Sequence, residues 1–266
     1  MARCLRAEAA GFDVALLGDH IDDQWDPLVM LEHLAHVTTR IRLGTLVLNN
    51  DFHHPVLLAR RIANLQDLSG GRIELGLGAG HTAQEYDTLG EEFRPPAERK
   101  ARLRESVAEM QAWWEANNVT VPLLIAGSGD ALLGHAAVHA DIIGLAGLGR
   151  TLDDGHNHET RWAPEYLDAQ VQLIREAAGD RSEHLELNAL IQGVEITADR
   201  AGFAAGLAER VGCTVDEALS TPFLAFGTYS EIAAQLKAAR ERWGISYFAV
   251  RSVTEFAPVV QLLRNQ

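Results

Sequence analysis

The sequence predicts an α/β protein built around a parallel sheet, with a (β/α)8 barrel as the leading architecture and an open doubly wound sheet as the alternative. Two observations support this class. Short runs of β-branched and leucine residues alternate with longer segments of helical periodicity, and most of these runs are apolar on successive residues, as strands buried on both faces must be. The first strands also begin about 30 residues apart, which is the length of one βα unit.

Seven strands and eight helices are predicted, and they alternate almost to the end of the chain. The predicted strands are Phe12 to Leu17, Ile41 to Leu48, Arg72 to Gly78, Val121 to Ala126, Asp141 to Ala146, Leu185 to Glu195 and Ile245 to Val250. The predicted helices are Ala2 to Ala10, Pro27 to Thr38, Pro55 to Leu68, Ala97 to Ala116, Ala131 to His139, Pro164 to Ala178, Arg200 to Val211 and Ser230 to Trp243. Because the chain opens in a helix that Gly11 can end, the first of the eight strands of a closed barrel is missing.

The composition is that of an ordinary globular chain, since 47% of the 266 residues are hydrophobic and 23% are charged. No linker or low-complexity run divides the chain, so we expect one domain over residues 1–266. The formal net charge of −14 disfavours nucleic acid and anionic membranes as partners. An anionic ligand therefore needs a local device, such as the backbone N–H groups at a helix start.

The expected location is the cytoplasm. Only two cysteines are present, Cys4 and Cys213, and their spacing fits neither a disulfide framework nor a zinc site. The amino-terminal residues lack the apolar region of a signal peptide, and no run of ~18 apolar residues occurs.

Polar residues follow four successive predicted strands, where a parallel barrel places its ligand site. The segments are Gly18-Asp19-His20, Asn49 to His54, Gly78 to His81 and Gly127 to Asp130. Glycine turns let backbone N–H groups approach a ligand closely, and a helix beginning near Asp130 adds its positive end, so the two turns can hold a phosphate. The alternative is that the glycines only permit tight packing at the rim. Gly76 to His81 does not follow the dinucleotide-binding fingerprint, because His81 stands at the sixth position.

Asp19 and His20 are the predicted catalytic residues, because an acid beside an imidazole can orient the ring and exchange a proton near neutral pH. The alternative for this pair is a surface turn. His53-His54 and His156-Asn157-His158 suggest a metal, but neither has further ligands at binding spacing, so no metal is expected.

Several motifs resemble those of the luciferase-like monooxygenase superfamily, and more narrowly its deazaflavin (coenzyme F420)-dependent oxidoreductases. They are Gly11 to Asp13, Asp19-His20, Arg40 to Asn50, His54-Pro55, Asp67 to Gly80, Leu124 to Gly129, Ala140 to Ile142, Phe226 to Ile232 and Gly244 to Phe248. The resemblance implies a barrel that holds a flavin-like ring in its mouth. The chain departs from the family pattern in lacking the first strand, in a short segment before Val121, and in carrying His81 where some relatives that oxidise sugar phosphates have Glu.

The resemblance also implies roles for individual residues. Asp19 would hydrogen-bond the ring and His20 would stabilise charge or move a proton. A non-proline cis peptide behind the ring falls on Leu46-Val47, with Asn49 facing the cofactor. The phosphate-bearing tail would follow Ala79, Gly80, Gln84, Ser128 and Gly129, and the substrate would meet His54 and His81.

The leading hypothesis is an oxidoreductase that transfers a hydride between coenzyme F420 and a small organic substrate. An FMN-dependent monooxygenase of the same superfamily is the first alternative, and a shortened, non-catalytic flavin-binding relative is the second. The resemblance implies a homodimer, which would also cover exposed sheet edges.

Overall fold

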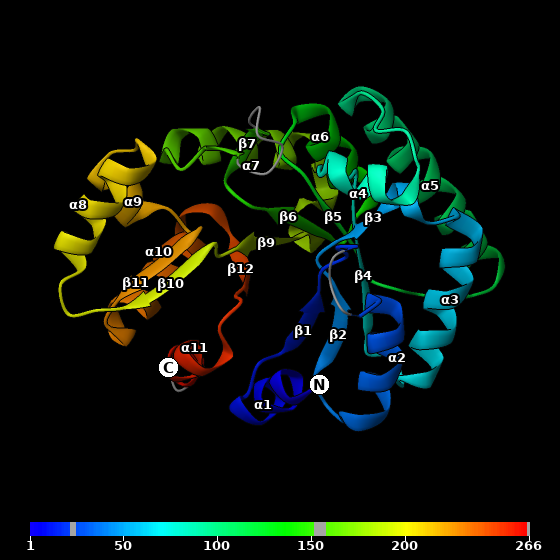
Figure 1. Cartoon of the computed structure of the whole chain (residues 1–266), viewed down its shortest axis with the longest axis horizontal. Helices are drawn as coiled ribbons and strands as arrows, with labels where there is room; N and C mark the ends of the chain where they lie inside the picture. Colours follow the sequence, from blue (N-terminus) through cyan, green and yellow to red (C-terminus); the bar gives the residue numbers. More distant parts are fainter. Residues whose placement is uncertain (22–24, 152–157, 265–266) are drawn as a thin grey trace.

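A curled parallel sheet forms the centre of the molecule (Figure 1). The computed structural model describes residues 1–21, 25–151 and 158–264. Seven strands follow one another across the sheet, and each pairs in parallel with the next. They are β1 (Val14–Leu17), β2 (Arg42–Thr45), β4 (Ile73–Gly78), β5 (Leu123–Ala126), β6 (Ile142–Leu145), β9 (Glu186–Leu190) and β12 (Ile245–Ala249). The short strand β3 (Leu48–Asn49) also pairs with β4.

The prediction of one strand from Leu185 to Glu195 is wrong. The segment divides into β9 in the main sheet and β10 (Gly193–Ile196), which pairs in parallel with β11 (Leu224–Gly227) in a separate sheet. The chain leaves the main sheet at Ile191 and Gln192, whose backbone N–H groups donate to the carbonyls of Ala249 and Phe223. An unbroken apolar pattern does not reveal such a change of partner, and β11 itself was not predicted. A further pair, β7 (Leu148–Thr151) and β8 (His158–Thr160), is antiparallel.

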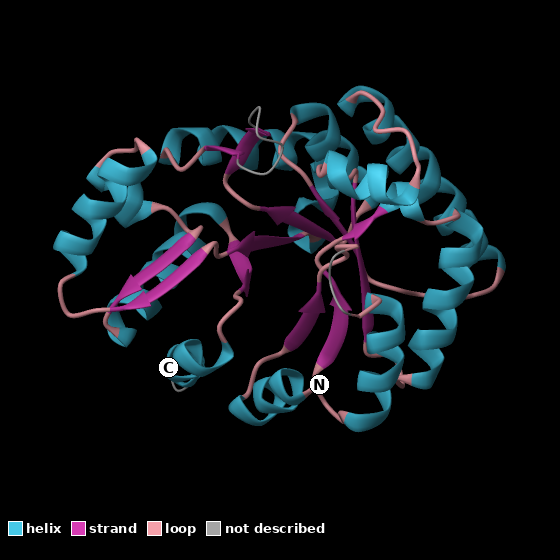
Figure 2. Ribbon diagram, in the orientation of Figure 1, coloured by secondary structure: helices cyan, strands magenta, loops and turns pink. Residues whose placement is uncertain are grey.

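Helices cover the outer side of the sheet (Figure 2). The eight predicted helices all form, with ends within one residue of those expected. They are α1 (Ala2–Ala10), α2 (Pro27–Val37), α3 (Pro55–Leu68), α5 (Pro96–Ala116), α6 (Asp130–His139), α7 (Pro164–Ala178), α8 (Arg200–Val211) and α10 (Tyr229–Trp243). Three more were not predicted: α4 (Ala83–Leu89), α9 (Val215–Ser220) and α11 (Val253–Arg264). Two short 3₁₀ helices, Asn50–Phe52 and Gly179–His184, complete the regular structure of the described residues.

Local chemistry sets the helix ends. The Asp26 side chain accepts from the backbone N–H groups of Leu28 and Val29 and so caps α2, while Pro27 takes a first-turn position where its missing N–H costs nothing. Thr228 and Glu231 form a reciprocal capping box at the start of α10. Gly11 and Gly244 end α1 and α10 in the left-handed conformation that glycine adopts without steric cost.

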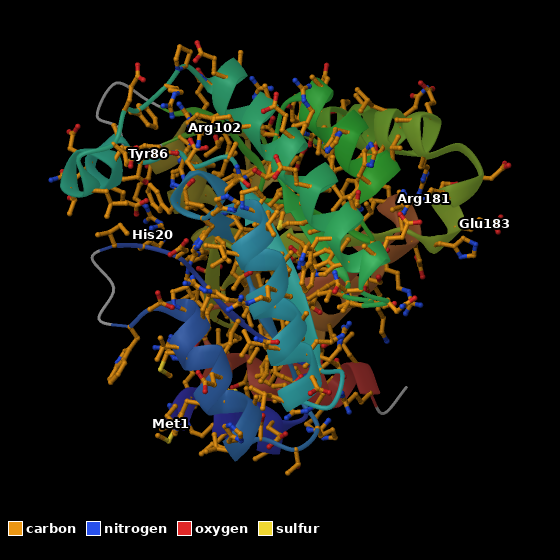
Figure 3. The ribbon with its side chains drawn as sticks, turned by 90° about the vertical axis from the view of Figure 1, so that its right-hand side faces the viewer. Met1, His20, Tyr86, Arg102, Arg181 and Glu183 are labelled. Carbon is orange, nitrogen blue, oxygen red and sulfur yellow. The ribbon has the colours of Figure 1, made fainter. Side chains whose placement is uncertain are left out.

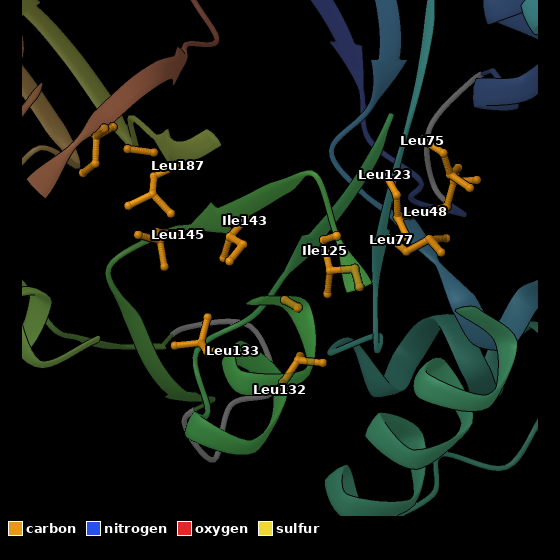
Figure 4. Close-up of a cluster of buried hydrophobic side chains, with 14 of the residues drawn as sticks. Leu48, Leu75, Leu77, Leu123, Ile125, Leu132, Leu133, Ile143, Leu145 and Leu187 are labelled. Carbon is orange, nitrogen blue, oxygen red and sulfur yellow. The ribbon is translucent and has the colours of Figure 1, made fainter. Parts of the chain in front are cut away.

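The main hydrophobic core lies between the sheet and the helices. Alternate residues of each strand point outward into it, and a cluster of leucine and isoleucine side chains joins β3 to β9 through the neighbouring strands and α6 (Figure 4). Leu75, Leu77, Leu123 and Ile143 are almost completely buried there. The opposite faces of the strands line the interior of the curled sheet, where Leu124, Ile142 and Tyr247 form a smaller cluster.

The sheet is a half-barrel, because among the described residues no strand pairs with the free edges of β1 and β12. A polar contact spans the interior instead. The Tyr247 hydroxyl on β12 donates to Glu74 Oε1 on β4 at 2.6 Å, and Arg42 on β2 lies 3.3 Å from Glu74 Oε2. Burial raises the pKa of both Glu74 and Tyr247. Outside the sheet, Gln261 donates to the Ala10 carbonyl at 2.8 Å, which links α11 to α1. The expected barrel-type fold without its first strand is thus confirmed.

Within the described residues, no helix combines the length and the apolar character that crossing a membrane requires.

Candidate active site

The loops that follow β1, β3, β4 and β5 meet at the carboxyl end of the sheet, and this end is called the mouth below. Figure 3 shows His20, Tyr86 and Arg102 at this end of the molecule and Met1 at the other. The convergence follows from the parallel arrangement, which brings all carboxyl strand ends to one edge. The polar segments predicted from the sequence are therefore neighbours in space.

Asp19 joins the end of β1 to the end of β3. Its Oδ2 accepts from the backbone N–H of Asn49 at 3.0 Å and lies 3.2 Å from Nε2 of His53. The side chains of Asp19 and His53 are 10% and 13% exposed, so this pair is almost enclosed. The proposed contact of Asp19 with a cofactor ring stays a prediction.

His20 pairs with a carboxyl group that the sequence did not single out. Its Nδ1 lies 2.7 Å from Oε1 of Glu85, on the first turn of α4. Glu85 is buried, whereas the His20 side chain is 52% exposed and so faces the open part of the mouth. The carboxyl group thus holds Nδ1 of an imidazole that is about half exposed.

Further imidazoles surround His20. The ring centroid of His81 lies 6.2 Å from that of His20 and 5.4 Å from that of His158. His81 is exposed at the rim, but its ring is crowded by neighbours. Burial, followed by repulsion from His158, His20 and Arg99, lowers its pKa to about 4. His81 is therefore uncharged near neutral pH.

The peptide between Leu46 and Val47 is cis, which confirms the expected position of this bond. It separates β2 from β3. Leu46 and Val47 pack in the interior cluster beside Leu124 and Ala126, directly below the mouth. Their contact with a cofactor stays a prediction.

Asn49 lies at the floor of the mouth and carries an unsatisfied donor. Its Oδ1 accepts from the Asp51 backbone N–H at 3.2 Å, whereas its buried Nδ2 has no partner among the described residues. The Tyr86 hydroxyl donates to Asp51 Oδ2 at 3.0 Å and lies 3.3 Å from Asn49 Oδ1. Burial raises the pKa of Tyr86 to about 12, which keeps this hydroxyl protonated. Arg102 lies 3.2 Å from the other Asp51 oxygen.

Gly80 must be glycine in this setting. Its φ is +72°, and a Cβ atom there would stand 2.3 Å from the Tyr86 hydroxyl and 2.7 Å from the Asn49 amide. The preceding Ala79 carbonyl accepts from Arg99 Nε at 3.2 Å, which fixes the turn. Gln84 follows on the first turn of α4, where it is exposed. The turn thus packs closely against Tyr86 and the Asn49 amide at the floor of the mouth.

The turn after β5 has the properties of an anion site. Gly129 begins α6, and no side chain caps this helix start. A Cβ at Gly129 would lie 2.8 Å from Lys100 Nζ, so an ammonium group stands beside the free N–H groups. The Ser128 carbonyl accepts from Tyr166 and Gln170, each at 3.4 Å, which holds the turn in place.

The structure brings most predicted site residues together, with one exception. His54 is exposed at the start of α3, and it is the neighbouring His53 that contacts Asp19. Sequence reasoning also missed Glu85, Tyr86 and Lys100. Lys100 had a signal, since it stands in a basic run with Arg99 and Arg102 in a chain that is acidic overall, and such a local group of cations fits the expected anion site.

No metal centre is found in the part of the chain that the structure describes, where no group of three or more histidine, cysteine or acidic residues has suitable geometry. His156 and Asn157 of the second histidine motif lie outside the described residues.

A parallel half-barrel with a helical cover defines a protein of the α/β-barrel class, and polar side chains gather at the carboxyl ends of its strands. Residues 1–247 match the sequence model of the luciferase-like monooxygenases, and the chain belongs to this family.

Two curated proteins with assigned enzyme activities are similar in sequence to this chain. The F420-dependent glucose-6-phosphate dehydrogenase of Amycolatopsis mediterranei (strain U-32) is 29% identical over 203 residues, which cover 65% of this chain and 57% of that protein. The 4-hydroxyprotoasukamycin monooxygenase of Streptomyces nodosus subsp. asukaensis is 36% identical over 101 residues, which cover 36% of this chain and 26% of that protein. The matched part of the chain thus spans little more than half of the first relative and about a quarter of the second.

A similar solved structure is that of an F420-dependent secondary alcohol dehydrogenase in complex with an F420-acetone adduct. It has a TM-score of 0.76 and 17% identity, and the match covers 99% of this chain and 94% of that chain. At this identity the likeness shows the fold.

Proposed function

We propose that the protein is an F420-dependent oxidoreductase that transfers a hydride between coenzyme F420 and a small organic substrate. The observation that carries the proposal is the gathering, at one mouth, of the His20–Glu85 pair and of two glycine turns suited to an anionic tail. The relationship to an F420-dependent dehydrogenase supports it.

The residues present fit such a cofactor. The buried, unpartnered Nδ2 of Asn49 needs an acceptor, which a carbonyl of a flavin-like ring offers. Asp19, Leu46 and Val47 complete the proposed ring site. The tail, which carries a phosphate, would follow the Gly80 turn past Ala79 and Gln84, and then reach Ser128, Gly129 and the Lys100 ammonium group. When bound, F420 supplies a ring carbon that accepts or donates the hydride.

The protein's own groups supply the proton chemistry. His20 presents an accessible imidazole beside the proposed ring site, so it would take a proton from a substrate that loses hydride and return it in the reverse direction. His81 is uncharged, so it would contribute hydrogen bonds rather than charge. We assign a substrate contact to His81, and not to His54, which is exposed at the start of α3.

An FMN-dependent monooxygenase is the second candidate. The relationship to a monooxygenase favours it, and FMN carries a phosphate that the turn at Gly129 would hold equally well. The third candidate, a non-catalytic flavin-binding relative, is suggested by the half-barrel.

Titration of the purified protein with oxidised F420, and with FMN in parallel, separates these candidates. We expect saturable quenching of F420 fluorescence, weaker binding of FMN, and loss of the oxidised F420 absorbance when a substrate alcohol is added. Tight FMN binding without F420 binding would favour the second candidate, whereas binding without turnover of any alcohol would favour the third.

We also propose a homodimer. The groove of about 420 Å³ between α2 and α3 is bordered by the exposed side chains of Val29 and Leu68, and Leu57 is exposed nearby on α3. Apolar side chains gathered on one face are typical of interfaces. Light scattering after gel filtration should give the mass of two chains, and Leu68→Glu should reduce it to one. For the location we propose the cytoplasm, because Cys4 and Cys213 are both free thiols.

A further inference from the structure

Glu85 occupies an unusual place for an acidic residue. It is 7% exposed as a residue, although acidic side chains are rarely buried without a partner. The hydrogen-bond partner shown for its carboxyl group is Nδ1 of His20, at 2.7 Å and across 65 positions of the sequence. A side chain buried at this cost, and directed at a mouth residue, requires a reason beyond the packing of the short helix α4.

The contact determines which nitrogen of His20 carries the proton. A carboxylate only accepts hydrogen bonds, so a neutral His20 that bonds to Glu85 must carry its hydrogen on Nδ1. Nε2 then has a free lone pair and can accept a proton. A partner on one ring nitrogen is the usual means by which proteins select the tautomer of a histidine.

The surrounding groups leave His20 as the suitable base. His53 is paired with Asp19 and is almost enclosed, at 13% exposed, so a substrate cannot approach it as easily. His81 has a pKa of about 4 and is a weak base near neutral pH. His158 and Arg99 are neighbours of His81, and their positive charge contributes to the low pKa of that ring.

We propose that Glu85 is a positioning residue that fixes His20 as the Nδ1–H tautomer, so that Nε2 serves as the general base for a substrate alcohol. The proposal rests on the proposed function for the identity of the hydride acceptor. In the oxidation of an alcohol, the proton of the hydroxyl group would pass to His20 Nε2 as the O–H bond breaks. The C–H bond of the carbinol carbon would break as well, bound oxidised F420 would supply the hydride acceptor, and the substrate would leave as a carbonyl compound.

The tautomer can be measured without cofactor or substrate. Protein labelled with 15N-histidine gives long-range 1H–15N correlations that distinguish the two tautomers, and His20→Ala identifies the His20 signals. At a pH where the ring is neutral, we expect the Nδ1–H form in the parent protein and in the control Asp87→Ala, which removes an exposed carboxyl group from the same helix. Glu85→Ala should shift the ring toward Nε2–H, and Glu85→Gln, which keeps an oxygen acceptor, should retain more of the Nδ1–H form.

Kinetics then test the consequence. With 2-propanol and glucose 6-phosphate as probe alcohols, Glu85→Ala should lower the rate of F420 reduction roughly 10- to 100-fold, with a smaller loss for Glu85→Gln. The Kd for F420 should change little. Because Glu85 acts through His20, the double variant should be no slower than His20→Ala alone.

Three results would overturn the proposal: an Nε2–H tautomer in the parent protein, an unchanged tautomer in Glu85→Ala, or additive losses in the double variant. The first needs no substitution of Glu85, so the test survives if Glu85→Ala fails to fold. Failure of the proposed function would appear separately, as absence of F420 binding with the tautomer as expected.

Discussion

At the amino ends of the strands, the charged side chains of Glu8 and Arg72 bind backbone groups, whereas at the carboxyl ends several charged side chains also pair with other side chains. Glu8 Oε1 accepts from the N–H groups of Thr39, Arg40 and Ile41 at 2.7 to 3.0 Å. Arg72 donates to carbonyl oxygens in three segments, among them Ala35 and Ile41 at 2.8 and 2.9 Å. These contacts satisfy backbone groups that the strand and helix ends leave open.

At the mouth, by contrast, side chains pair with side chains: His20 with Glu85, His53 with Asp19, and Tyr86 with Asp51. Some polar atoms there lack a partner, such as Asn49 Nδ2. In parallel barrels the carboxyl ends of the strands carry the ligand site and the amino ends contribute to stability, and the proposed function assigns the same division to this protein. This division predicts that substitutions at the two ends separate activity from stability.

The largest expected effect is that of His20→Ala on turnover. Removal of a proton-transferring imidazole should lower the rate of F420 reduction by the probe alcohols roughly 10²- to 10⁴-fold. The melting temperature should stay near that of the parent, because the side chain is 52% exposed. Unchanged turnover would remove His20 from the mechanism.

Arg72→Met should show the opposite behaviour. The substitution leaves several carbonyls without their donor and should lower the free energy of unfolding by about 2 to 4 kcal/mol, measured in urea. The Kd for F420 should match that of Arg60→Met, a control that removes an exposed arginine from α3. A loss of F420 affinity confined to Arg72→Met would contradict the separation of the two ends.

Gly129→Val tests the anion site at the mouth. The new side chain would crowd Lys100 Nζ and cover the start of α6, so the Kd for F420 should rise by about tenfold or more. Gly134→Val places the same side chain further along α6, where a Cβ meets nothing within 4 Å, and serves as the control. Equal affinities of the two variants would reject the placement of the tail.

The smallest effect is expected for Glu8→Gln, and it should depend on pH. Hydrogen bonds from Ile41, Arg40 and Thr39 lower the pKa of Glu8 in the folded protein. The ionised carboxylate therefore stabilises the fold above the unfolded pKa of about 4.5, and this contribution is lost as the pH falls through the folded value. Near neutral pH, the free energy of unfolding of the parent should be about 1 kcal/mol larger than that of Glu8→Gln. The difference is modest because Glu8 is only partly buried, and it should be smaller in acid. Urea unfolding at several pH values would show this; a difference that grows in acid would contradict it.

Elements of the fold could be predicted from the sequence wherever their burial produces a local pattern of apolar residues. Strands such as β4 and β6 are buried on both faces, so unbroken apolar runs mark them. α11 contains Pro258 within its helical pattern, so it was not recognised, and β11 was missed although it is as long as β5 and β6, which were predicted. A local pattern also does not show with which strand a segment pairs. For this reason β9 and β10, which belong to different sheets, were predicted as one strand.

The same reasoning explains what was found at the mouth. Asp19, His20 and Gly80 were identified because parallel strands bring their carboxyl ends together. Glu85 was not, because its contact with His20 depends on the orientation of α4, which no local pattern encodes. The contact between His53 and Asp19 was missed for a similar reason. The backbone conformation at the start of α3 decides whether the ring of His53 or that of His54 turns inward, and the sequence selected His54.

β1 and β12 each pair with only one neighbouring strand, so we expect local unfolding of the main sheet to begin at these two edges. Amide hydrogens in a strand that has a neighbour on each side exchange only when the sheet separates, whereas those on a free edge exchange with solvent directly. Deuterium uptake should therefore begin along β1 and β12 and reach β5 last. The contact between Tyr247 on β12 and Glu74 on β4 spans the interior of the sheet. Loss of this contact should accelerate deuterium uptake in β12 before it accelerates uptake in β5.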